Sequence, residues 1–168
     1  TTPMLNLSYR VTDNLMTYAT YSEGYKSGGA TFRIFPIFPE TPLYGPEEVQ
    51  SFEIGAKYEN NGYRLNLAAF SMDYENIQVS IFTNIAPVIK NGGEGEVDGF
   101  ELEAFMPLGG SFFVEGSFSY LDAKYTAIDP GATEINLNSK FAMTPKTQAS
   151  LGISKVFTLV GGSEIIPA

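Results

Sequence analysis

The chain has 168 residues, with 10 Lys and Arg against 19 Asp and Glu, and therefore a net charge of −9. This charge argues against a nucleic-acid partner, whose phosphates require a basic surface, and against adhesion to anionic lipid headgroups. Cysteine and histidine are absent, which excludes disulfides, zinc-thiolate sites and imidazole chemistry supplied by this chain alone.

Polar and apolar residues alternate along most of the chain, which predicts β-strands. Residues 5–9 and 15–22 form the first two expected strands, and residues 51–59 form the third. In the third strand, apolar side chains occupy every second position: Phe52, Ile54, Ala56 and Tyr58. No stretch approaches the ~20 apolar residues of a membrane helix, but strands that cross a membrane dilute their apolar residues with polar ones.

The fourth expected strand, residues 63–81, changes phase near Ala68-Ala69 and again before Ile77. We interpret these changes as a β-bulge, or as a strand that leaves a membrane and continues above it. Three further strands are expected at residues 100–106, 112–120 and 148–154. The alternation therefore predicts about seven strands.

The connections between these strands alternate between short and long. Short ones lie at residues 11–14, 60–62, 107–110 and 161–162, and long ones at 23–49, 82–95 and 125–144. Tight turns on one side and long loops on the other are typical of outer-membrane meanders, with the turns in the periplasm. The pattern predicts an all-β, antiparallel up-and-down transmembrane β-barrel in a bacterial outer membrane.

In such a barrel the apolar faces of the strands point to lipid and the polar faces point to the lumen. The side chains expected in the lumen are Glu53, Lys57, Arg64, Asn66, Glu101, Glu103, Glu115 and Gln148. Tyrosines near strand ends suit the aromatic girdles at the membrane interfaces, namely Tyr18, Tyr21, Tyr58, Tyr63 and Tyr120.

Four segments resemble the C-terminal barrel of TonB-dependent receptors. They are YSEGYKSGG at residues 21–29, GPEEVQSFEIGAK at 45–57, FSMDYENIQV at 70–79, and NGGE at 91–94 followed by VDGFELE at 97–103. The second of these shows the family's Pro-Glu and its aromatic-Glu-x-Gly-x-Lys strand. All four occur in the expected order along the meander.

The resemblance implies a barrel of about 22 strands around a plug domain. Seven strands cannot close such a barrel, so residues 1–168 are expected to be a fragment of it, about seven strands without the plug. The implied function is active import of a scarce nutrient, with a ferric siderophore as the first expectation. The implied partner is the TonB–ExbB–ExbD system, acting through the plug. No enzymatic activity, resident metal or cofactor is expected.

Candidate ligand contacts lie in the long connection at residues 23–49. Tyr25, Lys26, Arg33 and Tyr44 combine aromatic rings with cations, which suit an anionic metal chelate. The alternative is that these side chains only pack the loop. The carboxylate pairs Glu101/Glu103 and Glu94/Glu96 are interpreted as a polar wall of the lumen, hydrogen-bonded to the plug, rather than a calcium or acid–base site.

Two other classes of protein remain open. One is a barrel without energy coupling, of the porin or autotransporter type, which an upstream plug sequence would exclude. The other is a soluble all-β carbohydrate-binding domain, which predicts polar residues on the outward faces of its edge strands.

Overall fold

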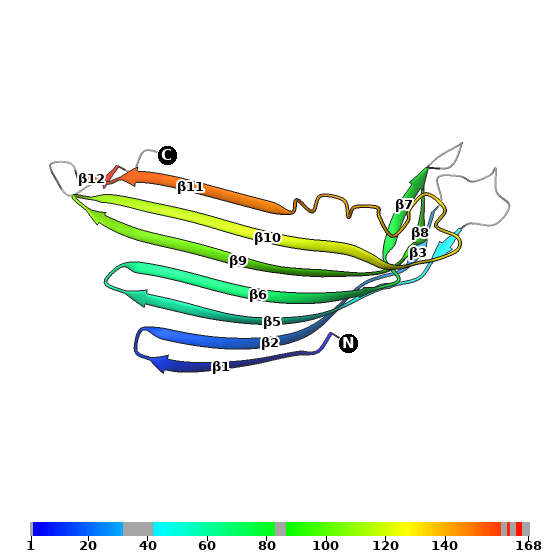
Figure 1. The fold of residues 1–168 in the computed structure, drawn as a ribbon, viewed down its shortest axis with the longest axis horizontal. Helices are drawn as coiled ribbons and strands as arrows, with labels where there is room; N and C mark the ends of the chain where they lie inside the picture. Colours follow the sequence, from blue (N-terminus) through cyan, green and yellow to red (C-terminus); the bar gives the residue numbers. More distant parts are fainter. Residues whose placement is uncertain (1, 32–41, 83–86, 159–160, 162–163, 166–168) are drawn as a thin grey trace.

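A seven-stranded antiparallel sheet forms most of the molecule (Figure 1). The computed structural model describes residues 2–31, 42–82, 87–158, 161 and 164–165. The strands of the sheet lie side by side in chain order, which confirms the predicted meander. They are β1 (Met4–Thr12), β2 (Leu15–Lys26), β5 (Glu47–Asn60), β6 (Tyr63–Glu75), β9 (Gly93–Gly109), β10 (Phe112–Ile128) and β11 (Thr147–Lys155).

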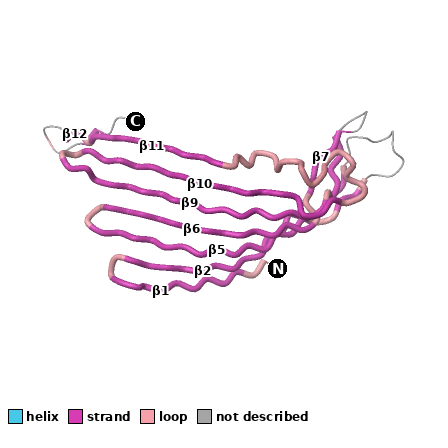
Figure 2. Tube along the Cα trace, viewed as in Figure 1, coloured by secondary structure: helices cyan, strands magenta, loops and turns pink. Residues whose placement is uncertain are grey.

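The long connections gather at one end of the sheet, called here the loop end, and the tight turns at the other, the turn end (Figure 2). Two small hairpins extend the loop end, β3 (Gly29–Ala30) with β4 (Leu43–Tyr44) and β7 (Gln78–Phe82) with β8 (Pro87–Asn91). The pair β12 (Phe157–Thr158) and β13 (Glu164–Ile165) follows β11. Across the described ranges, no helix is sufficiently long and apolar to span a membrane.

The turn between β5 and β6 contains Asn61 and Gly62, whose φ angles are 49° and 82°. Two consecutive positive φ angles define a type I′ turn, which matches the twist of the strands that it joins. Gly110 and Ser111, between β9 and β10, have φ angles of 57° and 66°. The tight connection predicted at 60–62 is therefore confirmed, whereas the one predicted at 107–110 lies at 110–111, because β9 continues to Gly109.

The register places apolar residues from all seven strands on one face. Tyr9, Thr17, Ala56, Leu67, Leu102, Phe118 and Ala149 form one row across the sheet. We call the apolar residues of this face, from the Ile153 row to the Phe52 row, the apolar band. Leu67 is 47% exposed and Leu151 is 78% exposed, so the band requires an apolar environment beyond this chain.

The opposite face carries the polar residues and is called here the polar face. Lys57 lies beside Asn66, and Asn66 lies beside Glu103, to which its side chain donates a hydrogen bond of 3.1 Å. All eight residues predicted for the lumen lie on this face, as the register requires. The predicted division into two faces is therefore present.

The predicted phase changes in residues 63–81 have a different cause from a bulge. β6 pairs with both neighbours without a register shift, so the β-bulge interpretation is wrong. Beyond Ala69, the face that carries the apolar band becomes polar at Ser71 and Asp73, while the other face becomes apolar. The second change is the end of the strand, where Asn76 has a φ of 55° and β7 begins two residues later.

Tyr18 lies on the polar face and not among the interfacial tyrosines, which corrects the girdle prediction for this residue. Its partner across β5 is Gly55, and its hydroxyl donates a hydrogen bond of 2.7 Å to Glu53. The ring covers Gly55 so closely that a Cβ there would lie 2.4 Å from the ring carbons. The missing side chain of Gly55 thus provides the space for Tyr18.

We expect Gly55→Ala to reduce the free energy of unfolding by about 1–3 kcal/mol, because the added methyl group overpacks the site and displaces the Tyr18 ring. In a Tyr18→Ala background the clash is gone, and the same substitution should be close to neutral. Urea unfolding of the protein in lipid vesicles measures both values. An equal cost of Gly55→Ala in the two backgrounds would contradict this account.

Candidate functional site

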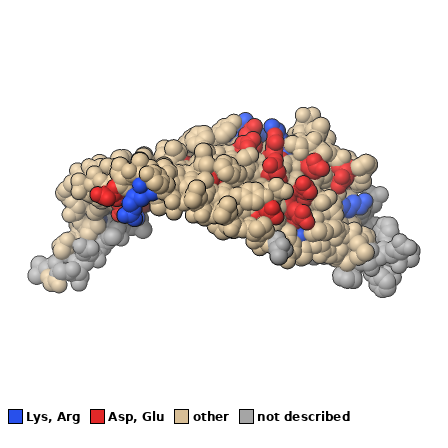
Figure 3. Space-filling model, turned by 90° about the horizontal axis from the view of Figure 1, so that it is seen from below, with Lys and Arg blue, Asp and Glu red and all other residues tan. Residues whose placement is uncertain are grey.

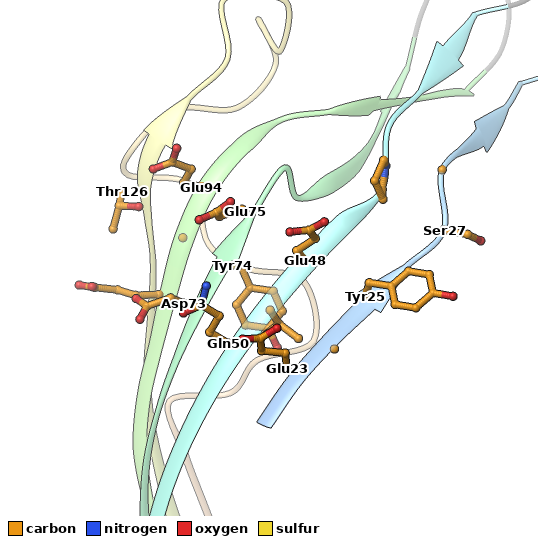
Figure 4. Close-up of a pocket in the computed structure, with 16 residues that line it drawn as sticks. Glu23, Tyr25, Ser27, Glu48, Gln50, Asp73, Tyr74, Glu75, Glu94 and Thr126 are labelled. Carbon is orange, nitrogen blue, oxygen red and sulfur yellow. The ribbon is translucent and has the colours of Figure 1, made fainter. Parts of the chain in front are cut away.

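An open cavity of about 850 Å³ lies near the loop end, among the ends of β2, β5, β6, β9 and β10 (Figure 4). Its charged lining consists of carboxylates: Glu23, Glu48, Asp73, Glu75, Glu94 and Glu96. Tyr25, Gln50 and Thr126 add polar groups. Figure 3 shows Asp and Glu gathered on the half of the molecule toward the loop end. The cavity therefore carries a negative potential.

The register explains why these carboxylates meet. Glu23, Gln50, Asp73, Glu96 and Lys124 form one row across five strands, on the same face as the apolar band and next beyond its end. Side chains two residues apart on a strand share a face. The residues of this row each lie two positions beyond the last row of the apolar band, so they lie on the same face. The acidic surface is the polar continuation of the apolar face.

Few cations offset this acidic surface. Lys124 forms an ion pair with Glu96, whose hydrogen bond raises the pKa of the Lys124 ammonium. Lys146 lies 3.2 Å from Asp122. Such exposed pairs contribute little stability. In the described part of the chain, no group of three or more metal-ligating side chains is placed to hold an ion.

An aromatic cluster occupies the polar face at the same end. The Phe141 ring lies 4.6 Å from the Tyr125 ring and 6.4 Å from the Tyr74 ring, between ring centroids. Gly95 lies under it, and a Cβ on Gly95 would approach Phe141 to 2.5 Å. Burial raises the pKa of Tyr74 and of Tyr125, and the Glu47 carboxylate raises both pKa values further. The cluster therefore anchors the β10–β11 connection with neutral phenols.

The raised pKa of Tyr125 predicts a loss of stability at alkaline pH. A phenol ionises near pH 10 in the unfolded chain but at higher pH in the folded protein. Its stabilising contribution is complete below about pH 10 and is lost as the pH rises through the folded pKa. We expect Tyr125→Phe to lose less stability between about pH 9 and 12 than the wild type. Denaturant midpoints across this range test it, and parallel losses would refute it.

The structure describes three of the four predicted ligand-contact residues, and it places Tyr25 and Lys26 on opposite faces. Tyr25 is 63% exposed and lines the acidic cavity, whereas Lys26, the next residue of the same strand, belongs to the opposite face. Tyr44 lies in β4 against Gly29, where a Cβ would approach its hydroxyl to 2.6 Å. Arg33 lies outside the described residues.

The carboxylates of the cavity were not predicted as a site, and the prediction that Glu94 and Glu96 line the lumen is wrong, because both lie on the face of the apolar band. Asp73 and Glu75 have the same odd parity as Leu65 and Leu67 of the same strand. If the alternation of Leu65 and Leu67 is continued through Ser71, it places Asp73 and Glu75 on the face of the apolar band, beyond its end toward the loops. The apolar residues Phe70 and Met72 on the other face concealed this signal, because they suggested a change of phase.

The sequence matches a family of known β-barrels, in agreement with the antiparallel sheet described above. The family model described as TonB dependent receptor-like, beta-barrel matches residues 1–162. The probable TonB-dependent siderophore receptor PiuA of Acinetobacter baumannii is 28% identical over 126 residues, which cover 71% of this chain and 17% of that protein. An uncharacterized TonB-dependent receptor of Haemophilus influenzae is 24% identical over 143 residues, covering 85% of this chain and 39% of that protein.

The ferric yersiniabactin uptake receptor FyuA of Yersinia pestis has the same fold, with a TM-score of 0.75 and 20% identity. The superposition covers 97% of this chain and 24% of FyuA. This chain therefore spans well under half the length of each of these proteins. The family match over residues 1–162 shows that the chain belongs to the TonB-dependent receptor β-barrel family, whose members are receptors and transporters of the outer membrane.

Proposed function

We propose that this chain is part of an outer-membrane receptor that actively imports a ferric siderophore, with energy supplied through TonB. The family match over residues 1–162 is the observation that carries this proposal. The likeness to PiuA, which is named a probable siderophore receptor, supports the choice of substrate class.

The proposal includes a longer protein with a plug domain, which would occupy the lumen and contact the TonB–ExbB–ExbD system. The polar face would then line the lumen, and its hydrogen-bonding groups would face the plug. Glu53, Glu101, Glu103 and Glu115 lie on that face. These carboxylates would provide acceptors for donors of the plug.

Ligand capture is proposed at the loop end through Tyr25, Lys26, Arg33 and Tyr44. An anionic chelate is repelled by the acidic cavity, so we assign the main contact to the polar face. Lys26 presents a cation there, and the half-buried rings of Tyr74 and Phe141 lie at the same end of that face. Tyr25 would contribute only at the rim.

Uptake of ⁵⁵Fe-loaded catecholate, hydroxamate and carboxylate siderophores tests the function. The full-length gene is expressed in cells that lack other siderophore receptors, with and without a functional TonB. We expect uptake of one class, dependent on TonB, and weaker binding in Lys26→Ala than in the control Lys140→Ala. Uptake without TonB would indicate a barrel without energy coupling, and uptake of haem or cobalamin alone would overturn the siderophore proposal.

A further inference from the structure

Two side-chain amides connect segments of the loop end that belong to different sheets. Gln78 and Asn91 face each other in the β7–β8 ladder. Their side chains bond Ser27, in the connection between β2 and β3, and Gly45, in the connection between β4 and β5. We call these two residues with their bonded partners the amide clamp.

Asn91 satisfies both backbone polar groups of Gly45. The Gly45 N–H donates to Asn91 Oδ1 at 2.7 Å, and Asn91 Nδ2 donates to the Gly45 carbonyl at 3.2 Å. Nδ2 also donates to the Asn76 carbonyl at 2.8 Å, at the junction between β6 and β7. The side chain of Asn91 thus pairs with Gly45 as a neighbouring strand would. The contact joins positions 46 residues apart in the sequence.

Gln78 makes the second half of the clamp. Its side-chain amide donates to the carbonyls of Ser27 at 3.0 Å and Gly45 at 3.1 Å. Its backbone N–H donates to Glu47 Oε2 at 2.7 Å, and a hydrogen bond to a charged acceptor is among the stronger ones. The Gly45 carbonyl accepts from both Gln78 and Asn91. The two amides therefore share a single acceptor.

A further contact supports the connection between the two hairpins. The N–H of Ile89 in β8 donates to Thr31 Oγ1 at 3.3 Å, and Thr31 is only 9% exposed. Thr31 directly follows β3. No ladder pairing joins β3–β4 to β7–β8 within the described residues. In this part of the chain, the hydrogen bonds that connect the two hairpins are thus made by side chains.

We propose that Gln78 and Asn91 are positioning residues that hold the β3–β4 and β7–β8 hairpins in one fixed orientation. The loop end then presents a pre-organised surface, which lowers the entropy cost of binding a ligand there. The statement about ligand binding rests on the proposed siderophore function. The fixed orientation of the hairpins does not depend on that function.

Spin-label distances in the full-length receptor, without any ligand, test the clamp. Leu43 in β4 is 80% exposed and Phe82 in β7 is 73% exposed, so both accept a nitroxide after replacement by cysteine. This chain has no cysteine of its own. The measurements compare the labelled receptor with the additional substitutions Asn91→Ala, Asn91→Asp and Gln78→Met. Asn136→Ala is the control, because the Asn136 side chain bonds Asn138 within its own turn.

We expect a narrow distance distribution in the wild type and in Asn136→Ala. Asn91→Ala and Gln78→Met should broaden it about twofold, because the freed hairpins sample more orientations. Asn91→Asp keeps the acceptor for the Gly45 N–H but loses the donors, and should also broaden it. A width like that of the wild type in the clamp variants, with normal barrel insertion, overturns the proposal. A failed siderophore assay would leave this result unchanged, so the two proposals fail separately.

Discussion

Replacement of Leu67 by lysine is expected to destabilise the membrane-inserted barrel by about 2–4 kcal/mol. Leu67 lies in the middle of the apolar band, between Ala56 and Leu102, and is 47% exposed. In an outer-membrane barrel this surface faces hydrocarbon, where an ammonium group loses its hydration. The free energy of unfolding in urea, measured in lipid vesicles of the full-length receptor, gives the size of the effect.

Asn66→Lys is the matched control for this experiment. Asn66 is the preceding residue of β6 and lies on the polar face beside Glu103. A lysine there remains hydrated, and the Glu103 carboxylate on one side offsets the like charge of Lys57 on the other, so we expect a change within about 1 kcal/mol. Equal destabilisation by the two lysines would contradict the assignment of the faces and favour a soluble sheet.

Gly93→Ala is expected to destabilise the loop end by about 3 kcal/mol or more, through backbone strain and a backbone clash. Gly93 has a φ of 134°, which favours glycine, and a Cβ there would lie 2.1 Å from the Ala127 carbonyl oxygen. Its own carbonyl accepts from the Ile77 N–H at 2.9 Å. The substitution therefore strains β9, β10 and the β6–β7 junction together.

Hydrogen exchange at the loop end measures this effect. We expect exchange in residues 87–95 and 126–129 to be about a hundredfold faster in Gly93→Ala, since local opening becomes easier. Exchange near the turn end should be unchanged. Gly131→Ala is the control, because no atom lies within 4 Å of a Cβ there. Wild-type exchange in Gly93→Ala would refute the predicted strain.

The main sheet was predictable because its signals are local. Period-two alternation and tight connections such as Asn61-Gly62 identified seven strands and both of their faces. The β7–β8 hairpin was missed because residues 77–81 alternate again after the phase change before Ile77, and alternation does not show whether such a change is the end of a strand. Only the φ of 55° at Asn76 shows that the chain turns there.

The candidate site was harder to predict, because it depends on which residues become neighbours. Tyr25 and Lys26 were both predicted as ligand contacts of one loop, but adjacent residues of a strand point to opposite faces. Strand β2 extends to Lys26 and therefore includes both. The predicted loop began at residue 23, and in a loop successive side chains do not alternate between two faces. The sequence therefore offered no reason to place Tyr25 and Lys26 on opposite faces.

By itself, the sequence determined the strand content, the positions of the turns and the two chemical faces, because each is encoded within a few consecutive residues. Only the tertiary structure decided that Glu23, Asp73 and Glu96 share one acidic row and that Gln78 and Asn91 meet Gly45. These contacts join residues about 20–50 positions apart, and they follow from strand register and from the packing of connections. Neither property leaves a pattern in a short window of sequence.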